Sequence, residues 1–235
     1  MKAQNSTYTD PTRHNVSTQL AAAWTHAPTG CFCHITSVFF HALTQQIPQK
    51  VFIRRRDIAP RKTKRTNPLS DSQIRSQFIK PHKSTGKRVP LPGGECVLIS
   101  GYKNDQTGVI PVPEQYRAFP EGARITDLER CLIDAVVAPQ YNGGVMSLPA
   151  LFREAAKQLD LQKLIDHYWE LEFLYPFHQT IGFFLKTSGQ KEAAKRWRDT
   201  FPPTNRFFVD KTAKTNWVYD ETWQVHYPRG LTNDH

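Results

Sequence analysis

Basic side chains are concentrated in one short part of the 235-residue chain. Residues 50–88 contain thirteen lysines and arginines and only two acids, Asp57 and Asp71, so this segment carries a charge of +11. The rest of the chain has 18 basic and 19 acidic residues and is almost neutral. Guanidinium groups bind phosphates through paired hydrogen bonds, and ammonium groups act as point charges. The thirteen candidate nucleic-acid-binding residues are Lys50, Arg54, Arg55, Arg56, Arg61, Lys62, Lys64, Arg65, Arg75, Lys80, Lys83, Lys87 and Arg88.

So many like charges repel one another and destabilise a compact state unless a polyanion or counterions neutralise them. Neutralising a phosphate also releases condensed counterions, which drives association with nucleic acid. The simplest alternative is that this segment is a solvated, partly flexible loop whose lysines and arginines serve only solubility. A membrane surface fits less well, because the segment lacks an apolar helical face. We therefore expect contacts with the phosphates of nucleic acid.

Three acids near residue 130 have side chains that could act in acid–base catalysis or hold a metal. Thr126 and Glu129 have the spacing of a capping box, in which hydroxyl and carboxylate accept from amides at a helix start. Arg130 and Asp134 have the i, i+4 spacing of a helical ion pair. Asp127 and Glu129 are two residues apart and face different directions on a helix. We therefore assign these acids structural roles and expect no catalysis by them.

Other residues with catalytic chemistry lack a recognisable arrangement. Glu95, with Lys103 beyond the strand that follows it, is the remaining nuclease-like candidate, and its spacing matches no metal-nuclease signature. Gly86-Lys87 lacks the upstream glycine and the following Ser or Thr of a phosphate-binding loop. His41 and His178 lie on predicted helices, where a lone histidine is most often a hydrogen-bonded packing residue. We expect neither a catalytic residue nor a cofactor.

The four cysteines are too few and too scattered for a disulfide scaffold. Cys31 and Cys33 precede His34 in a metal-like arrangement, but no second ligand pair at finger-like spacing follows. Cys96 and Cys131 lie in apolar runs, where a free cysteine behaves as a small hydrophobe. We therefore expect no metal site.

The first half of the chain predicts two helices followed by short extended segments. Apolar residues at helical spacing define the helices, and short apolar or alternating runs bounded by Pro and Gly define the strands. The predicted helices are Ser17–Trp24 and Thr36–Gln46, and the predicted extended segments are Val51–Arg55, Gln73–Lys80, Cys96–Ser100 and Gly108–Val112.

Helical patterns dominate after residue 125. Thr126, Ser147 and Asp160 are predicted N-caps, and Pro176 suits a first helical turn. The predicted helices are Thr126–Val137, Leu148–Gln158, Leu161–Leu171, Phe177–Thr187 and Lys191–Arg198, and Asn205–Val209 and Thr222–Tyr227 are predicted to be extended.

These elements predict an α+β fold with a small, mostly antiparallel sheet and a helical C-terminal half. The expected organisation is a polar leader at residues 1–16, a helix pair with a basic β-rich subdomain at 17–124, and a helical subdomain with closing strands at 125–235. The sequence has no run of about 18 apolar residues, as a membrane span requires. Its start lacks the apolar centre of a secretory signal. We therefore expect a soluble cytoplasmic protein with no membrane partner.

Four motifs follow one another in an order typical of one protein family. His34–Pro48 contains Ser-Val-Phe-Phe-His-Ala-Leu and then Gln-Ile-Pro, and Ile125–Asp134 reads Ile-Thr-Asp-Leu-Glu-Arg-Cys-Leu-Ile-Asp. Tyr175–Leu185 begins Tyr-Pro-Phe-His-Gln and is followed by Gly189, and Trp223–Val225 comes near the end. Together the motifs cover about residues 31 to 228 and resemble the main domain of AbiEi-type antitoxins, the regulatory half of type IV toxin–antitoxin systems.

The resemblance implies a transcriptional autorepressor that silences an operon shared with a nucleotidyltransferase-like toxin, its possible protein partner. Family members usually carry an N-terminal winged helix-turn-helix, but about 30 residues precede the matching region here. Ala42 also replaces the glycine that usually follows the histidine. Repression through a recognition helix is therefore not expected, and the basic segment is the remaining candidate for nucleic-acid contacts.

We expect an antitoxin-like regulatory protein that binds nucleic acid, most simply duplex DNA, without catalysing a reaction. Two alternatives remain. A nucleic-acid-processing enzyme predicts three acids that converge in a cleft beside the basic segment. A protein-interaction module that counters a toxin, or pairs with a separate DNA-binding subunit, predicts an exposed apolar patch.

Overall fold

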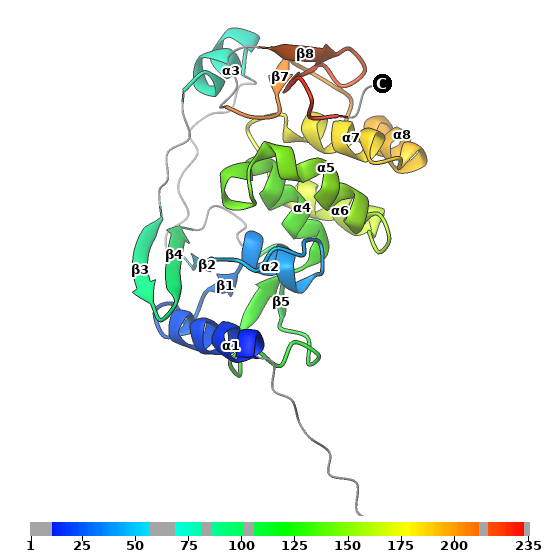
Figure 1. Ribbon diagram of the computed structural model, residues 1–235. Coiled ribbons are helices and arrows are strands. Elements are labelled where there is room, and N and C mark those ends of the chain that lie inside the picture. Colours follow the sequence, from blue (N-terminus) through cyan, green and yellow to red (C-terminus); the bar gives the residue numbers. More distant parts are fainter. Residues whose placement is uncertain (1–10, 57–68, 81–85, 101–105, 212–215, 233–235) are drawn as a thin grey trace, which may run out of the picture.

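The computed structural model describes residues 11–56, 69–80, 86–100, 106–211 and 216–232. A six-stranded sheet occupies the N-terminal half, and helices form most of the C-terminal half (Figure 1). A three-stranded sheet and one further helix lie at the far side of the helical layer. The predicted α+β class is confirmed. In these ranges, no helix is both long and apolar enough to cross a membrane.

The large sheet has the strand order β3-β4-β2-β1-β6-β5. Antiparallel pairs predominate, as predicted, but β2 pairs in parallel with β4 and β1 pairs in parallel with β6. The sheet is larger than the four or so strands that the sequence predicts. Its strands are β1 (Cys31–Phe32), β2 (Lys50–Arg55), β3 (Lys87–Leu91), β4 (Gly94–Ser100), β5 (Val109–Pro111) and β6 (Arg124–Thr126).

Side chains of the large sheet alternate between two faces, and each face has its own apolar layer. Ile53 faces α1 (Pro11–Trp24) and lies in one cluster with Leu20. Phe52 belongs to the cluster on the opposite face, together with Val97. The two layers make β2 a central strand that is buried on both sides.

Helix α4 (Leu128–Val137) is the central helix of the C-terminal half. Cys131, Leu132 and Ile133 are fully buried in the largest core cluster, and α4 packs against four other α-helices. The other elements of this layer are α5 (Leu148–Ala155), α6 (Leu161–Glu170), α7 (Phe177–Thr187), α8 (Lys191–Thr200) and the 3-10 turns η1 (Pro139–Tyr141) and η2 (Val145–Ser147).

The small sheet packs on α7 and has the order β7-β9-β8, with bounds Phe207–Phe208, Val225–Pro228 and Trp217–Asp220. Two residues of α7 fix this contact. The buried amide of Gln179 donates to the backbone oxygen of Trp223 (2.8 Å) and accepts from the amide of Asn205 (3.2 Å). A Cβ atom at Gly182 would lie 2.2 Å from the ring of Trp223, so only glycine fits there. These contacts give a structural role to three residues of the antitoxin-like motifs.

The prediction of an extended segment at Gln73–Lys80 is wrong, because Asp71–Phe78 forms helix α3. Ser70 and Gln73 form a capping box: Ser70 Oγ accepts from the Gln73 amide (3.4 Å), and Gln73 Oε1 accepts from the Ser70 amide (3.0 Å). Ile74 and Phe78, one helical turn apart, are buried against the rest of the protein. The capping signal, rather than the apparent alternation, identifies the element.

Several predicted boundaries are confirmed, and others shift. α7 has the predicted bounds, and the bounds of β2 and α6 differ from the prediction by one residue. α1 begins at Pro11, so residues 11–16 are helical and do not belong to a polar leader. Asp127 rather than Thr126 caps α4, with its carboxylate accepting from the Arg130 amide (2.9 Å). Ser147 makes no side-chain cap on α5.

Helix α2 (Ile35–Phe40) is shorter than the predicted Thr36–Gln46, and Ala42 explains where it ends. Ala42 has a φ of 57°, in the left-handed region that disfavours residues with a Cβ atom. Its amide donates to the backbone oxygen of Phe39 (3.0 Å), and the amide of Leu43 donates to that of Val38 (3.0 Å). This pattern is the Schellman end of a helix, which normally carries glycine.

The substitution Ala42→Gly should therefore stabilise the protein by about 0.5–1 kcal/mol, because glycine adopts this backbone conformation without strain. The midpoint of urea unfolding measures the effect. Ala193→Gly within α8 is the matched control and should lower stability by about 0.5–1 kcal/mol. A loss of stability in both variants would contradict the strain assigned to Ala42.

Candidate nucleic-acid interface

The predicted phosphate contacts that the structure describes do not form one continuous surface. Eight of the thirteen lie in the described part of the chain, in β2, β3 and the region of α3. The other five lie outside the described residues and are Arg61, Lys62, Lys64, Arg65 and Lys83.

Arg54 is not a surface residue, which corrects its assignment as a phosphate contact. It lies on the same face of β2 as Phe52, is 1% exposed, and donates from Nη2 to the carboxylate of Asp134 in α4. A guanidinium enclosed between sheet and helix cannot reach a phosphate in solution. The sequence gives no sign of this pairing, since the two residues are 80 positions apart.

A second arginine completes this buried ionic cluster of Arg54, Asp134 and Arg130. Arg130 Nε donates to Asp134 Oδ1 (2.9 Å), which confirms the predicted i, i+4 pair, and Nη1 donates to the backbone oxygen of Thr107 (2.5 Å). All three side chains are almost fully buried. Burial alone would raise the pKa of Asp134, but the charges of Arg130 and Arg54 hold that pKa well below its ordinary value. The cluster therefore joins β2, α4 and the segment before β5 through charged hydrogen bonds.

The acids considered for catalysis hold α4 to α6. Asp127 Oδ2 lies 2.8 Å from His167 Nε2 and 3.0 Å from Lys163 Nζ. Glu129 accepts from the Asp160 amide (3.0 Å) and pairs with Lys163 (3.2 Å). Glu129 therefore bonds to the N-terminal end of α6, and not to the start of its own helix α4 as a capping box would require. Within the described ranges, no three His, Cys, Asp or Glu side chains form a group that could hold a metal ion.

Lys50 and Arg88 both form ion pairs with Glu95, which the sequence analysis considered as a nuclease-like acid. Lys50 Nζ lies 2.6 Å and Arg88 Nη1 3.6 Å from Glu95 Oε1. The hydrogen bond from Lys50 lowers the pKa of Glu95. Lys50 and Arg88 remain partly exposed, but one of their two charges is neutralised within the sheet.

Three basic residues remain exposed at one end of the sheet, and we call them the sheet-end cluster: Arg55, Arg56 and Lys87. Arg55 pairs in register with Ser100 at the end of β4, and Lys87 begins the antiparallel neighbour β3. Among the residues that the structure describes, these three have no acidic partner. This end of the sheet therefore presents uncompensated positive charge.

Arg75 and Lys80 lie elsewhere, because α3 packs beside β7 and away from β3 and β4 (Figure 1). Two basic residues that the sequence analysis did not include join them from the C-terminal part. Arg206 lies over the ring of Tyr219 (5.8 Å to the centroid), and the charges of Arg206 and Arg75 add to burial in lowering the pKa of His226. Lys211 lies near Lys80. No local pattern connects Lys211 to Lys80, which is 131 positions earlier.

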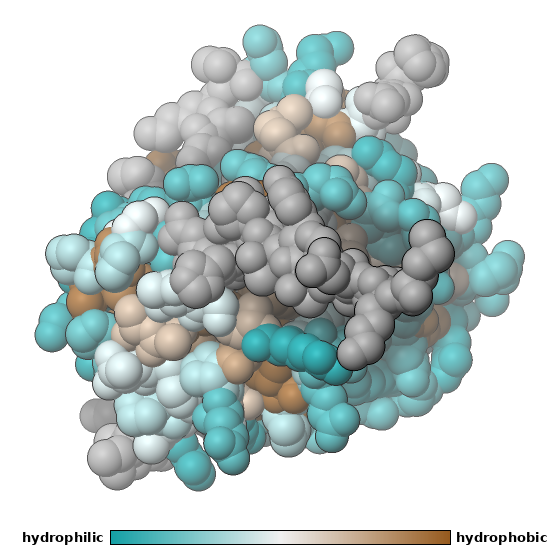
Figure 2. Space-filling view, turned by 60° about the horizontal axis from the view of Figure 1, so that its bottom comes forward, coloured by the Kyte–Doolittle hydropathy of each residue, from teal (hydrophilic) through white to brown (hydrophobic). Residues whose placement is uncertain are grey.

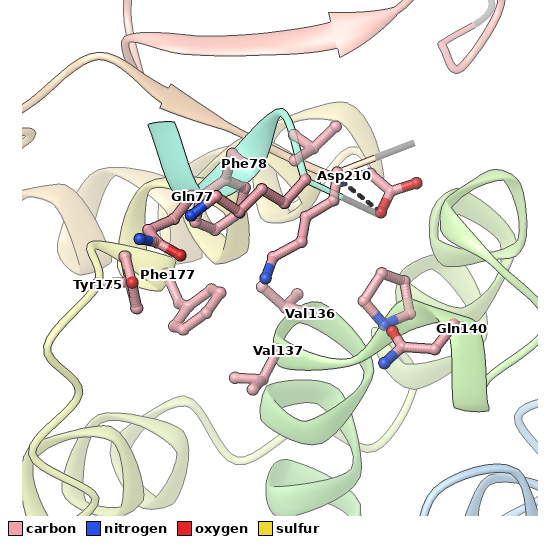
Figure 3. Close-up of a pocket in the computed structure, with 12 residues that line it drawn as sticks. Gln77, Phe78, Val136, Val137, Gln140, Tyr175, Phe177 and Asp210 are labelled. Atoms are coloured by element: carbon pink, nitrogen blue, oxygen red, sulfur yellow. Dashed lines mark hydrogen bonds between the residues drawn. The ribbon is translucent and has the colours of Figure 1, made fainter. Parts of the chain in front are cut away.

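Lys80 and Lys211 line a cavity of about 390 Å³ at the junction of α3, α4, η1, α7 and the end of β7. Figure 3 shows its walls, with Phe78 and Phe177 on one side and Val136, Val137 and Gln140 on another. Burial lowers the pKa of Lys211, Asp210 opposes this effect, and Lys80 reinforces it. The cavity can hold an anionic group next to an apolar surface.

His41 and His178 are hydrogen-bonded packing residues, as predicted. His41 Nε2 lies 2.7 Å from the backbone oxygen of Thr126, and His178 Nε2 lies 3.2 Å from that of Pro202. Burial lowers the pKa of both rings, that of His178 to about 4. The four cysteines are all described, are all buried, and form no disulfide bond.

The face that carries α1 is mostly hydrophilic. Figure 2 brings this side of the molecule forward and shows hydrophilic side chains around smaller hydrophobic areas. Larger exposed apolar side chains occur singly along the chain, and Trp169 is the most exposed of those in the described ranges, at 60%.

Two neighbouring arginines test the assignment of the buried cluster. Arg54→Met should destabilise the fold by about 3–5 kcal/mol, because Asp134 loses a buried partner. Arg55→Gln, one position along β2, should change stability by less than about 0.5 kcal/mol, because its side chain is exposed. Urea unfolding of both variants measures the contrast, and equal effects would refute the burial of Arg54.

The buried rings predict a stability that depends on pH. Burial lowers the pKa of His34 to about 4, and Asn142 Nδ2 donates to its Nδ1 (3.1 Å). An unfolded histidine has a pKa near 6.5, so the unfolded state binds more protons as the pH falls from about 6.5 to about 4. Stability should therefore fall over this window, by at most about 3 kcal/mol from His34.

His34→Asn should flatten this dependence, since asparagine does not titrate and tolerates the positive φ of 54° at this position. Urea unfolding between pH 7 and pH 5 measures the slope for each protein. His178 remains in the variant and keeps part of the slope. An unchanged slope would show that His34 is not a buried neutral ring.

Comparison with known proteins identifies a similar fold. No family model and no curated protein matches the sequence. The structure is similar to the RV2827C protein from Mycobacterium tuberculosis, with a TM-score of 0.56 and 11% sequence identity. The match covers 88% of this chain and 66% of that chain, so this chain spans just under two thirds of that protein's crystallised length. At this identity the likeness concerns the fold, and the chain is similar in fold to that mycobacterial protein.

Proposed function

We propose that this protein is a regulatory protein of the AbiEi antitoxin type that binds duplex DNA without catalysing a reaction. The observation that carries the proposal is the sheet-end cluster of Arg55, Arg56 and Lys87, whose charges are exposed and lack acidic partners in the described ranges. Neutralising phosphates there would release counterions and favour association. Phosphate contacts of this kind position a protein on DNA without reading its sequence.

The arrangement of the cluster supports contact with a backbone rather than with bases. Arg55 and Lys87 lie on strands that are separated by β4, so their backbones are about 10 Å apart. Exposed side chains on two strands and the chain beyond them can reach several phosphates of one duplex. Sheet residues of this kind do not form a recognition helix, so the proposal includes no base readout.

The proposed absence of catalysis is supported by how the acids are used. Asp134, Asp127 and Glu129 each bond to basic groups or backbone amides of neighbouring elements. Glu95 binds Lys50 and Arg88. Each acid that the sequence offers for a nuclease site thus has a structural partner that accounts for it.

A toxin-countering interaction is the second candidate, and the exposure of Trp169 favours it. Trp169 packs against Phe201 with the two rings tilted (4.9 Å between centroids) near the end of α6, and Leu174 nearby in the chain is 39% exposed. Exposed tryptophans are enriched at protein interfaces. If the neighbouring gene encodes a nucleotidyltransferase-like toxin, Trp169→Ser should reduce the protection that co-expression gives against it.

Salt dependence tests DNA binding directly. The variant Arg55→Gln, Arg56→Gln, Lys87→Gln should bind a duplex oligonucleotide more weakly and reduce the slope of log K against log salt by about 2.7, or about 0.9 per lost phosphate contact. Fluorescence anisotropy at several salt concentrations measures both quantities.

The matched control removes the same charge from an exposed helix. Lys191→Gln, Lys195→Gln, Arg198→Gln on α8 changes the net charge equally and should leave the slope almost unchanged. Absence of duplex binding at low salt, or equal slopes in the two triple variants, would refute the proposal.

A further inference from the structure

The cavity beside α3 has features that DNA binding at the sheet-end cluster does not use. Apart from Asp210, its polar lining residues come from four separate parts of the chain and share one property: within the described ranges, none of their side chains forms a hydrogen bond or an ion pair. These residues are Gln77, Lys80, Gln140, Tyr175 and Lys211.

The two lysines give the cavity its charge. Lys211 is half-buried, with Nζ 5.3 Å from the centroid of the Phe78 ring, so its ammonium group lies against an apolar surface. Lys80 lies two residues beyond the end of α3, and its charge repels that of Lys211. Asp210, whose carboxylate accepts from the Lys211 amide (2.6 Å, dashed in Figure 3), offsets one of these charges. The side chains therefore leave the cavity with a net charge of +1, which favours a bound anion.

The remaining walls suit a compact ring rather than an ion alone. Phe78, Phe177 and Val209 are buried and apolar. Gln77 and Gln140, at the exposed rim, carry amides that both donate and accept, as the edge of a base requires. Small-molecule sites combine an apolar lining with a few polar groups in volumes of roughly 300–1,000 Å³. A cavity of about 390 Å³ lies at the small end of that range, which suits one nucleotide.

We propose that this cavity binds a nucleoside 5′-phosphate, with Lys80 and Lys211 on the phosphate and the base against Phe78 and Phe177. The ligand is a free mononucleotide or the phosphorylated 5′ end of a strand, which present the same chemical group. The site also uses the Tyr-Pro-Phe motif, since Tyr175 and Phe177 line it. It is separate from the sheet-end cluster, so either site can exist without the other.

Calorimetric titration with adenosine 5′-monophosphate tests the site on the intact protein. We expect saturable binding that weakens at least about ten-fold in Lys211→Gln and in Lys80→Gln, because a charged hydrogen bond is lost in each. Adenosine should bind more weakly than its monophosphate. Lys195→Gln, which removes an exposed lysine of α8, is the control and should bind as the parent protein does.

Proton uptake gives a readout that a structural role of Lys211 would not. A bound dianion raises the pKa of Lys211, so the binding enthalpy measured near pH 9 should depend on the ionisation enthalpy of the buffer, and this dependence should decrease in Lys211→Gln. Tetrathymidylate with and without a 5′-phosphate distinguishes the two ligand sources. If only the phosphorylated strand binds, and binding requires Lys211, the cavity recognises strand ends.

The inference is overturned if neither probe binds, or if Lys211→Gln and Lys80→Gln bind as tightly as the parent protein. The two proposals fail separately. The sheet-end triple variant should keep nucleotide binding, whereas Lys211→Gln should keep the salt slope for duplex DNA. Loss of duplex binding alone would leave the cavity site intact.

Discussion

The rest of the structure depends on one buried carboxylate. Asp134 accepts hydrogen bonds from Arg54 of the sheet and Arg130 of its own helix, in a region that excludes water from all three side chains. Isolated burial of any one of these charges would cost several kcal/mol, so each is tolerated only because the others are present. The ion pair of Arg54 and Asp134 sets the position of α4 on β2. Helix α4 in turn provides the central core of the helical half. Apolar packing could hold the same elements together, but it would specify their register less strictly.

The basic side chains of residues 50–88 have several different roles. The net charge of the segment does not distinguish these roles. Arg54 belongs to the core, and Lys50 and Arg88 pair across strands with Glu95. Among the described residues of the segment, Arg55, Arg56 and Lys87 lie together at the sheet end, exposed and without an acidic partner. Arg75 and Lys80 are carried by α3 to the small sheet, where residues from the C-terminal part surround them. Charge density along a chain predicts a polyanion partner only for residues that the fold leaves on one surface.

Local signals in the sequence predicted most elements, and distant contacts account for the burial of Arg54 and for the cavity that were missed. Helix α7 was predicted with its observed bounds because Pro176 and one apolar stripe define it locally. The error at α3 was also local: the capping box of Ser70 and Gln73 is visible in the sequence and was outweighed by a short alternation. The burial of Arg54 was not predictable, because its partner is 80 residues away and an arginine in β2 looks the same whichever face it occupies. The cavity lysines come from two parts of the chain that only the fold brings together.

The antitoxin-like motifs coincide with residues that build the fold. Gln179 forms hydrogen bonds with the segments that precede β7 and β9, and Gly182 leaves room for the ring of Trp223. Ala42 occupies the left-handed position where the motif has glycine. In this chain, these residues serve the fold directly. A resemblance carried by them speaks first for the arrangement of helices and sheets. We therefore propose that function depends on the sheet-end cluster and on the two cavity lysines, all of which lie outside the motifs.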